Sequence, residues 1–241
     1  MQNSPFLVPT LSRIAGFDFD ALQQSRAYDA LMRLPLLAWS VGVAIKTGSE
    51  LVVYEREADP MLQDALYAVN IAMQLAVIAF FLTLAGMVVV RARPTGKARG
   101  FEPRVSALFG TFLIPVVALF PRCELRLAAG LVSTLLLLAG SSLAVYVLTH
   151  LGRSFSVMPE ARGLVTSGLY RHVRHPLYLA EMIASTGTVL QFLSVWTGLI
   201  MAVQVAFQLR RMRNEEVVLA SIFPDYAAYQ KRTARIIPGM Y

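Results

Sequence analysis

The sequence predicts an all-α, polytopic integral membrane protein built as a bundle of about six helical spans. Of its 241 residues, 56% are hydrophobic and only 15% are charged, whereas a soluble domain carries about 25% charged residues. The apolar residues form runs close to the roughly 20 residues that a helix needs to cross the hydrocarbon core. Basic residues gather in alternate segments between these runs, as expected for loops on the cytoplasmic side.

The first four predicted spans occupy residues 34–54, 62–90, 105–120 and 125–148. The first span contains Lys46 and Glu50, whose i,i+4 spacing allows an ion pair on one helix face. The third span is short and contains Pro115. These features set the boundaries of the first half of the bundle.

The apolar run over residues 177–212 is too long for a single span. As one helix it would extend about 54 Å, well beyond the bilayer core. Two shorter helices joined near residues 191–194 form a hairpin and give six spans in total. A single long tilted helix is the alternative, and it gives five spans.

The distribution of charge between the spans predicts the orientation of the chain. Residues 91–104 and 150–176 carry an excess of arginine and lysine, and the tail after Gln208 is rich in arginine. Residues 55–64 are mostly acidic, and residues 121–124 are nearly neutral. Six spans place every basic segment and both termini in the cytoplasm. We therefore expect a multi-pass protein of a bacterial inner (plasma) membrane.

The predicted domain organisation has three parts. Residues 1–33 form an N-terminal segment that lacks the pattern of a signal peptide and can hold a short interfacial helix. Residues 34–120 form accessory transmembrane helices, and residues 121–241 form the core with the candidate site. The net charge of +7 lies in loops beside apolar spans, so no nucleic-acid partner is predicted. The sequence leaves the oligomeric state open.

The segment from residue 168 to residue 181 is the first candidate for a functional site. It holds two His, two Arg, two Tyr and one Glu between two apolar segments, and titratable groups are expensive beside hydrocarbon. Pro176 is suited to the first turn of a helix, so Tyr178 and Glu181 share one face near the cytoplasmic surface. His175 lies just before them. The alternative interpretation is a set of interfacial anchors.

A second polar cluster lies at residues 210–216, where Glu215 and Glu216 follow three arginines. Arg211 and Glu215 are four apart, so they could simply pair on an exposed face. The functional hypothesis is that one glutamate turns inward and binds a cation beside the first cluster, because the hairpin brings both clusters to one membrane face. A metal site is not predicted, since His172 and His175 lack a third ligand at suitable spacing.

Together the two clusters resemble a superfamily of membrane methyltransferases that includes the isoprenylcysteine carboxyl methyltransferases and the phospholipid N-methyltransferases. The resemblance covers roughly residues 125–241 and departs from the usual pattern at Leu169, where Pro is common, and at Ala180, where Gly is common. The residues that carry it are Gly168, Tyr170, Arg171, Arg174, His175, Pro176, Tyr178, Glu215, Glu216, Leu219, Phe223 and Tyr229, with residues 151–156, 164–166 and 232–239.

The resemblance implies methyl transfer from S-adenosylmethionine to an amphiphilic or lipid-linked acceptor at the cytoplasmic face, with an isoprenylcysteine-type carboxylate the most similar acceptor. Lipid-like or prenylated substrates would enter sideways from the bilayer. The implied cofactor-binding residues are Leu164, Val165, Gly168, Tyr170, His172, His175, Pro176, Tyr178, Glu215 and Glu216. The implied catalytic residues are Arg174, Arg211 and Glu181, with the two arginines orienting an acidic acceptor.

Two further functions stay open at this point. The acceptor atom could be oxygen, nitrogen or sulfur, so a phospholipid amine or a small thiol is an alternative acceptor. A membrane transporter or ligand-binding membrane protein is the alternative from another class. It is motivated by Lys46 and Glu50, because paired charges inside a bundle can mark a solute path.

Overall fold

A computed structural model describes residues 33–57, 64–98, 100–123, 125 and 127–239, and the predicted interfacial helix in residues 1–32 lies outside this range. The described chain is mostly helical. Its helices are α3 (Leu34–Glu57), α4 (Asp64–Val90), α5 (Glu102–Phe112), α6 (Leu127–Leu151), α7 (Pro176–Gln191), α8 (Val195–Ile222) and α9 (Tyr226–Arg232). Shorter elements are the 3₁₀ helices η1 (Ile114–Leu119), η2 (Gly152–Ser154) and η3 (Gly168–Arg171) and the strands β1 (Gly96–Lys97) and β2 (Glu160–Ala161).

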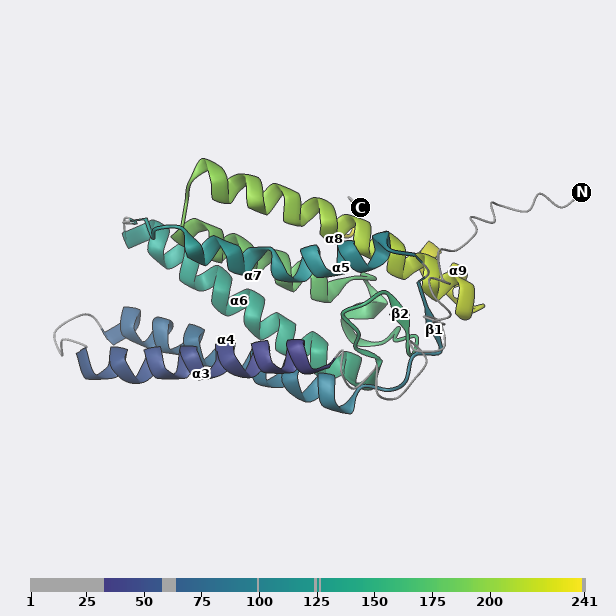
Figure 1. Cartoon of the computed structure of the whole chain (residues 1–241), viewed down its shortest axis with the longest axis horizontal. Helices are drawn as coiled ribbons and strands as arrows, with labels where there is room; N and C mark the ends of the chain where they lie inside the picture. Colours follow the sequence, from purple (N-terminus) through teal and green to yellow (C-terminus); the bar gives the residue numbers. More distant parts are fainter. Residues whose placement is uncertain (1–32, 58–63, 99, 124, 126, 240–241) are drawn as a thin grey trace, which may run out of the picture.

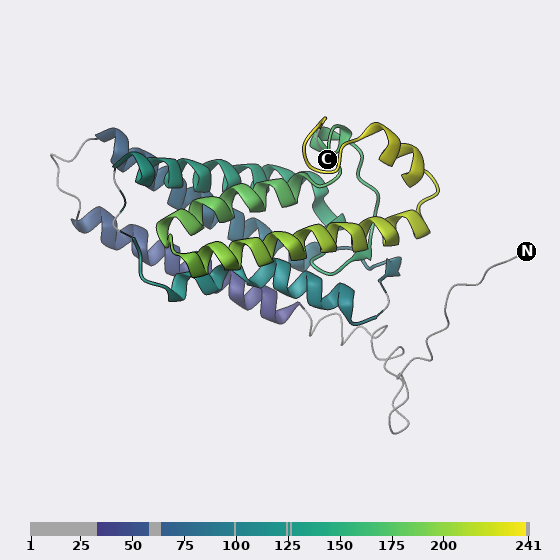
Figure 2. The same ribbon diagram turned by 90° about the horizontal axis from the view of Figure 1, so that it is seen from above.

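The long helices lie lengthwise beside one another in an elongated bundle (Figure 1). Helix α6 packs between α4 and α7, α3 packs on α4, and α5 packs along α8. The strands and α9 gather at one end of the bundle, and the α7–α8 turn lies at the opposite end, as the second view also shows (Figure 2). The bundle therefore brings several connecting segments together at one end.

Three helical segments in the described residues are long and apolar enough to cross a membrane: Leu34–Val53, Leu66–Val90 and Leu127–Ser154. They match the first, second and fourth predicted spans, and they support the predicted membrane class. Helix α7 has only 16 residues, and the second half of α8 contains a charged stretch. The count of six spans and the cytoplasmic orientation stay predictions.

The third predicted span is wrong as a single helix. Helix α5 ends at Phe112, and η1 begins at Ile114. Pro115 lies in the first turn of η1, where it has no N–H to donate and its ring excludes the α-helical path of the preceding residues. The chain therefore crosses this part of the bundle as two short pieces.

The predicted hairpin is confirmed, because α7 and α8 are separate helices joined by residues 192–194. Ser194 ends the turn as the N-cap of α8. Its hydroxyl accepts a hydrogen bond from the Thr197 amide at 3.2 Å, and the Thr197 hydroxyl accepts one from the Ser194 amide at 2.9 Å. This capping box satisfies amides that the first helical turn leaves unpaired.

Helices α6 and α7 approach closely because small residues face each other. A Cβ atom added to Gly140 would lie 2.5 Å from the Ala184 amide nitrogen, and one added to Gly187 would lie 2.8 Å from the Ser133 carbonyl oxygen. The Ser133 hydroxyl also donates to the Gly187 carbonyl at 2.8 Å. Such contacts are typical of helix pairs in lipid, where close packing replaces the hydrophobic effect.

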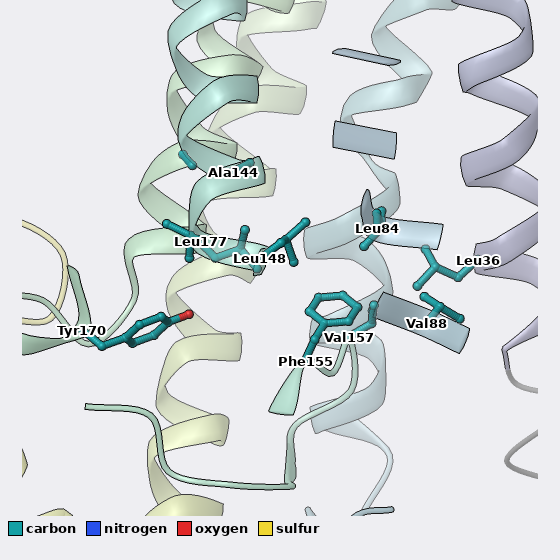
Figure 3. Close-up of a cluster of buried hydrophobic side chains, with 11 residues drawn as sticks. Leu36, Leu84, Val88, Ala144, Leu148, Phe155, Val157, Tyr170 and Leu177 are labelled. Atoms are coloured by element: carbon teal, nitrogen blue, oxygen red, sulfur yellow. The ribbon is translucent and has the colours of Figure 1, made fainter. Parts of the chain in front are cut away.

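A cluster of buried apolar side chains joins the helices to the segment that follows α6 (Figure 3). Leu84 and Val88 of α4 and Leu148 of α6 belong to it, together with Phe155 and Tyr170 from the segment between α6 and α7. All five are at most 8% exposed. The cluster therefore holds the connection between α6 and α7 against the end of the bundle.

A two-residue antiparallel pairing, not predicted from the all-α pattern, ties the α4–α5 connection to the same segment. Gly96 and Lys97 pair with Ala161 and Glu160. Beside them, the buried Arg162 guanidinium donates to the Ala92 carbonyl and to Glu160. Backbone and ionic contacts thus hold the α4–α5 connection against the α6–α7 connection, although the two lie far apart in the sequence.

Replacement of Gly140 by leucine should disrupt the α6–α7 interface, because the new side chain meets backbone that cannot move aside. We expect a loss of about 1–3 kcal/mol of stability, measured as a lower melting temperature in detergent. Gly86→Leu in α4 is the matched control, since a Cβ there meets nothing within 4 Å. Equal melting temperatures for the two variants would contradict the close packing.

Candidate functional site

A pocket lies at the end of the bundle where the connecting segments meet. Its wall combines the segment after α6, the start of α7, the second half of α8 and the C-terminal segment. The lining residues are Leu151, Ser154, Ser156, Met158, Glu160, Gly163, Leu164, Val165, Tyr170, Arg174, His175, Leu177, Tyr178, Arg211, Glu215, Leu219, Tyr226 and Tyr229. The two polar clusters predicted from the sequence therefore do meet in space.

One wall of the pocket carries an interlocked group of three side chains. The Tyr178 hydroxyl donates to Glu215 Oε1, and the Arg211 guanidinium lies 4.8 Å from the centre of the Tyr178 ring. Arg211 Nε is 3.5 Å from Glu215 Oε1, and the Arg211 side chain is only 3% exposed. The Arg211–Glu215 pair is therefore buried in the site, and the alternative of a pair on an exposed face is wrong.

Arg211 also reaches across to α5, where its Nη1 donates to the Thr111 hydroxyl at 3.0 Å. On the exposed side of the contact between α5 and α8, Arg210 Nε lies 2.7 Å from Glu102 Oε1. Helix α5 lies in the part predicted as accessory, and yet it holds a residue of the pocket wall in place.

Glu216 has a different environment from its neighbour Glu215. Its Oε1 accepts hydrogen bonds from Arg174 Nε at 2.8 Å and from His175 Nε2 at 3.2 Å, and its Oε2 accepts one from Arg235 Nη2 at 2.6 Å. Burial by itself raises the pKa of this carboxyl, but the hydrogen bonds from these three side chains outweigh burial and hold the pKa well below its usual range. Glu216 does not line the pocket; it holds the C-terminal segment from behind.

Arg174 connects this buried carboxylate to the end of α9. Its Nη1 donates to the carbonyls of Gln230 and Thr233. The backbone continues the connection, since the amides of Arg174 and His175 donate to the carbonyls of Ala234 and Arg235 at 2.9 and 3.0 Å. The Nε and Nη1 groups of Arg174 thus donate to partners within the protein and anchor the C-terminal segment. Its expected role toward an acceptor is secondary to this anchoring and stays a prediction.

Three tyrosines, Tyr170, Tyr226 and Tyr229, form another wall of the pocket. The Tyr229 hydroxyl donates to the Tyr170 carbonyl at 2.7 Å, and the rings of Tyr226 and Tyr229 meet at 62° with centroids 5.9 Å apart. Burial raises the pKa of all three hydroxyls, that of Tyr229 to about 12. This wall is therefore aromatic and uncharged at neutral pH.

The predicted catalytic residue Glu181 does not line the pocket. Its carboxylate accepts a hydrogen bond from Gln208 Nε2 at 2.8 Å. Glu181 is one helical turn after Tyr178, and Gln208 is nearly one turn before Arg211, so the pair lies on the membrane side of the charged wall. Gln208 is completely buried.

The remaining predicted residues divide into two groups. Leu164 and Val165 line the pocket, whereas Gly168, His172 and Pro176 do not. Gly168 has φ +59°, which favours glycine, and a Cβ there would meet the His150 ring. His172 is exposed, and Pro176 is the buried first residue of α7. Gly168 and Pro176 therefore shape the segment, and His172 lies on the exposed surface.

Sequence reasoning missed part of the pocket. Tyr229 carried the family resemblance but received no role, and Tyr226 was not singled out; their helical spacing of three residues was the available signal. Ser154 and Ser156 belong to residues 151–156, which carry the family resemblance but received no role. Met158 and Glu160 had no signal, because a short irregular connection brings them to the site.

Lys46 and Glu50 pair at 3.4 Å as predicted, with side chains 73% and 51% exposed. They therefore lie on the outside of the described bundle and not along an internal path. The Lys46–Glu50 pair therefore does not support the alternative of a transporter.

Comparison with known proteins supports the predicted resemblance. Residues 132–221 match the isoprenylcysteine carboxyl methyltransferase (ICMT) family. This matched region contains most of α6 and α8 and all of α7, and it ends before α9. The pocket wall from the C-terminal segment therefore lies outside the matched region.

Three curated proteins are similar to parts of the chain. The cobalt-zinc-cadmium resistance protein CzcN of Cupriavidus metallidurans is 37% identical over 79 residues, which cover 32% of this chain and 36% of CzcN. Protein-S-isoprenylcysteine O-methyltransferase A of Arabidopsis thaliana is 29% identical over 51% of this chain and 66% of its own length. Protein-S-isoprenylcysteine O-methyltransferase of Schizosaccharomyces pombe is 35% identical over 41% of this chain and 45% of its own length. The alignments thus span between about a third and two thirds of these relatives.

Glu216→Gln should loosen the C-terminal segment, because it removes the charge that Arg174 and Arg235 share. We expect a local loss of about 1–3 kcal/mol, measured as faster amide hydrogen exchange over residues 226–239. Glu102→Gln serves as the control, since it removes a carboxylate that pairs on the exposed side of α8. Unchanged exchange in Glu216→Gln would contradict the anchoring role.

The same contact predicts a pH dependence. Since the pKa of Glu216 is lowered by folding, its stabilisation is fully present above the unfolded value of about 4.3 and is lost as the pH falls below it. The difference in amide protection over residues 226–239 between the wild type and Glu216→Gln, measured at each pH, should therefore be constant from pH 8 to pH 5. It should shrink below about pH 4.

Proposed function

We propose that this chain, whose residues 132–221 match the ICMT family, is a membrane methyltransferase that uses S-adenosylmethionine and methylates an amphiphilic or lipid-linked acceptor. The favoured acceptor is an isoprenylcysteine-type carboxylate, reached at the cytoplasmic membrane face. The observation that carries the proposal is the pocket in which Tyr178, Arg211 and Glu215 meet the aromatic C-terminal wall.

The residues of the pocket fit this cofactor chemically. S-adenosylmethionine carries an ammonium, a carboxylate and a sulfonium beside an uncharged nucleoside. Glu215 suits the ammonium, and His175 suits the carboxylate. The faces of Tyr170 and Tyr178 suit the sulfonium methyl group, partly by cation–π attraction. Each charged group of the cofactor thus has a complementary side chain among the lining residues.

Methyl transfer requires the protein mainly to align the two reactants. When bound, S-adenosylmethionine supplies a methyl group on an already activated leaving group. The pocket then has to hold the two reactants in line and exclude water, which can contribute several kcal/mol to the barrier reduction. The pocket lies among buried aromatic side chains at the end of a membrane bundle, and this placement suits both tasks.

Arg211 is the residue that we assign to the acceptor. Its guanidinium lies in the pocket wall, and the Glu181–Gln208 pair lies one turn nearer the bilayer. A lipid-linked carboxylate that enters between the helices would pass this pair and then reach the Arg211 guanidinium. Since a carboxylate needs no general base, Arg211 would only have to orient it. An amine or thiol acceptor must lose a proton, and Glu181 is the candidate base for that alternative.

The cytoplasmic location of the site and a bacterial inner membrane complete the proposal. They are supported by the basic residues of segments 91–104 and 150–176 and of the tail, which the bundle gathers at the pocket end.

Glu215→Gln should lower the affinity for S-adenosylhomocysteine at least about tenfold, because a neutral amide replaces the partner of the ligand's ammonium. Isothermal titration calorimetry on purified protein measures this loss. Glu102→Gln, which removes an exposed carboxylate of α5, should bind like the wild type. If the wild type takes up no S-adenosylhomocysteine at millimolar concentration, the proposed function is wrong.

The acceptor is tested with cofactor carrying a labelled methyl group. A prenylated, N-acylated cysteine should become labelled, and phosphatidylethanolamine and a small alkyl thiol should not. Arg211→Lys should reduce kcat/KM for the prenylated acceptor by about tenfold or more, because an ammonium cannot reproduce the fork geometry of a guanidinium. Labelling of the amine or the thiol alone would move the assignment to that acceptor.

A further inference from the structure

The hydroxyl of Tyr226 is an unusual group in the pocket wall. Tyr226 lines the pocket from α9 and is only 1% exposed. Within the described part of the chain, its Oη is buried and has no hydrogen-bond partner. A buried hydroxyl without a partner costs free energy, and most buried polar groups in folded proteins are paired. Tyr226 therefore lacks a hydrogen-bond partner among the described residues, and a bound ligand could supply one.

Neighbouring tyrosines show that the pocket can satisfy such groups. The hydroxyl of Tyr229 donates to the Tyr170 carbonyl, and that of Tyr178 donates to Glu215. Helix α9, which carries Tyr226, is also held at its C-terminal end by Arg174. Helix α9, which carries the unpaired hydroxyl, is thus held in position by these hydrogen bonds.

Charged side chains and tyrosines of the pocket wall come largely from different elements, although Arg174 and Glu160 also line the pocket. Arg211, Glu215 and His175 lie on the helices α7 and α8 or at their start, whereas Tyr170, Tyr226 and Tyr229 form the other wall. The charged amino-acid end of S-adenosylmethionine suits the first side. Its uncharged nucleoside suits an aromatic wall that offers ring faces and one neutral hydroxyl.

We propose that the Tyr226 hydroxyl hydrogen-bonds an uncharged polar atom of the cofactor's nucleoside, either a ribose hydroxyl or an adenine ring nitrogen. This inference rests on the proposed function and adds a binding residue outside the matched region. Burial raises the pKa of Tyr226, so its hydroxyl stays neutral and can both donate and accept. The C-terminal segment thereby contributes recognition as well as closure.

The test compares Tyr226→Phe with Tyr229→Phe, which each remove one hydroxyl and keep the ring. Without ligand, Tyr226→Phe should melt at or slightly above the wild-type temperature, because it removes an unpaired buried group. Tyr229→Phe should melt lower, because it breaks the hydrogen bond to the Tyr170 carbonyl. These melting curves also show that both variants are folded.

Binding is then measured with two ligands, S-adenosylhomocysteine and 5′-methylthioadenosine, which has the nucleoside but no amino-acid end. Tyr226→Phe should weaken both ligands by the same factor, about five- to tenfold. Glu215→Gln should weaken S-adenosylhomocysteine and leave 5′-methylthioadenosine unchanged. The two variants together separate the two ends of the pocket.

Unchanged affinity in Tyr226→Phe would overturn the inference and leave the proposed function standing. A loss restricted to S-adenosylhomocysteine would overturn the assignment to the nucleoside, as would a wild type that does not bind 5′-methylthioadenosine. A wild type that binds neither ligand would overturn both the inference and the proposed function.

Discussion

The candidate site depends on one buried carboxylate, Glu216, and the three cationic or hydrogen-bonding groups around it. Arg174 and His175 come from the start of α7, and Arg235 comes from the C-terminal segment. Through Glu216 of α8, these contacts join three parts of the chain at one point. Such a group is costly to bury unless it is fully paired. Its pairing explains why the C-terminal segment lies against the helices and completes a pocket wall.

The adjacent glutamates show how one helix can serve structure and binding at successive residues. Side chains that follow each other in a helix point about 100° apart. Glu215 therefore faces the pocket beside Tyr178 and Arg211, while Glu216 faces the C-terminal segment. The doubled glutamate thus places one carboxylate in the pocket wall and the next one on the anchor of the C-terminal segment.

The sequence predicted what depends on hydrophobic length and on local spacing. The spans of α3, α4 and α6, the hairpin of α7 and α8 and the meeting of the two polar clusters follow from such patterns. Pro115 was noted in the sequence, but it did not show that the helix ends there, because a proline can also lie within a kinked span. The β1–β2 pairing and the placement of Tyr226 depend on tertiary contacts between short irregular segments, which carry no periodic signal.

The position of α9 has a consequence for the order of events during biosynthesis. The long apolar helices precede the C-terminal segment along the chain, so they can enter the membrane while residues 226–236 are still unmade. The pocket wall closes only after those residues have emerged and Arg235 has reached Glu216. Membrane insertion and assembly of the site are therefore separate steps in time, and a chain stopped at Ile222 would be inserted with Tyr170 but without Tyr226 and Tyr229 of the aromatic wall.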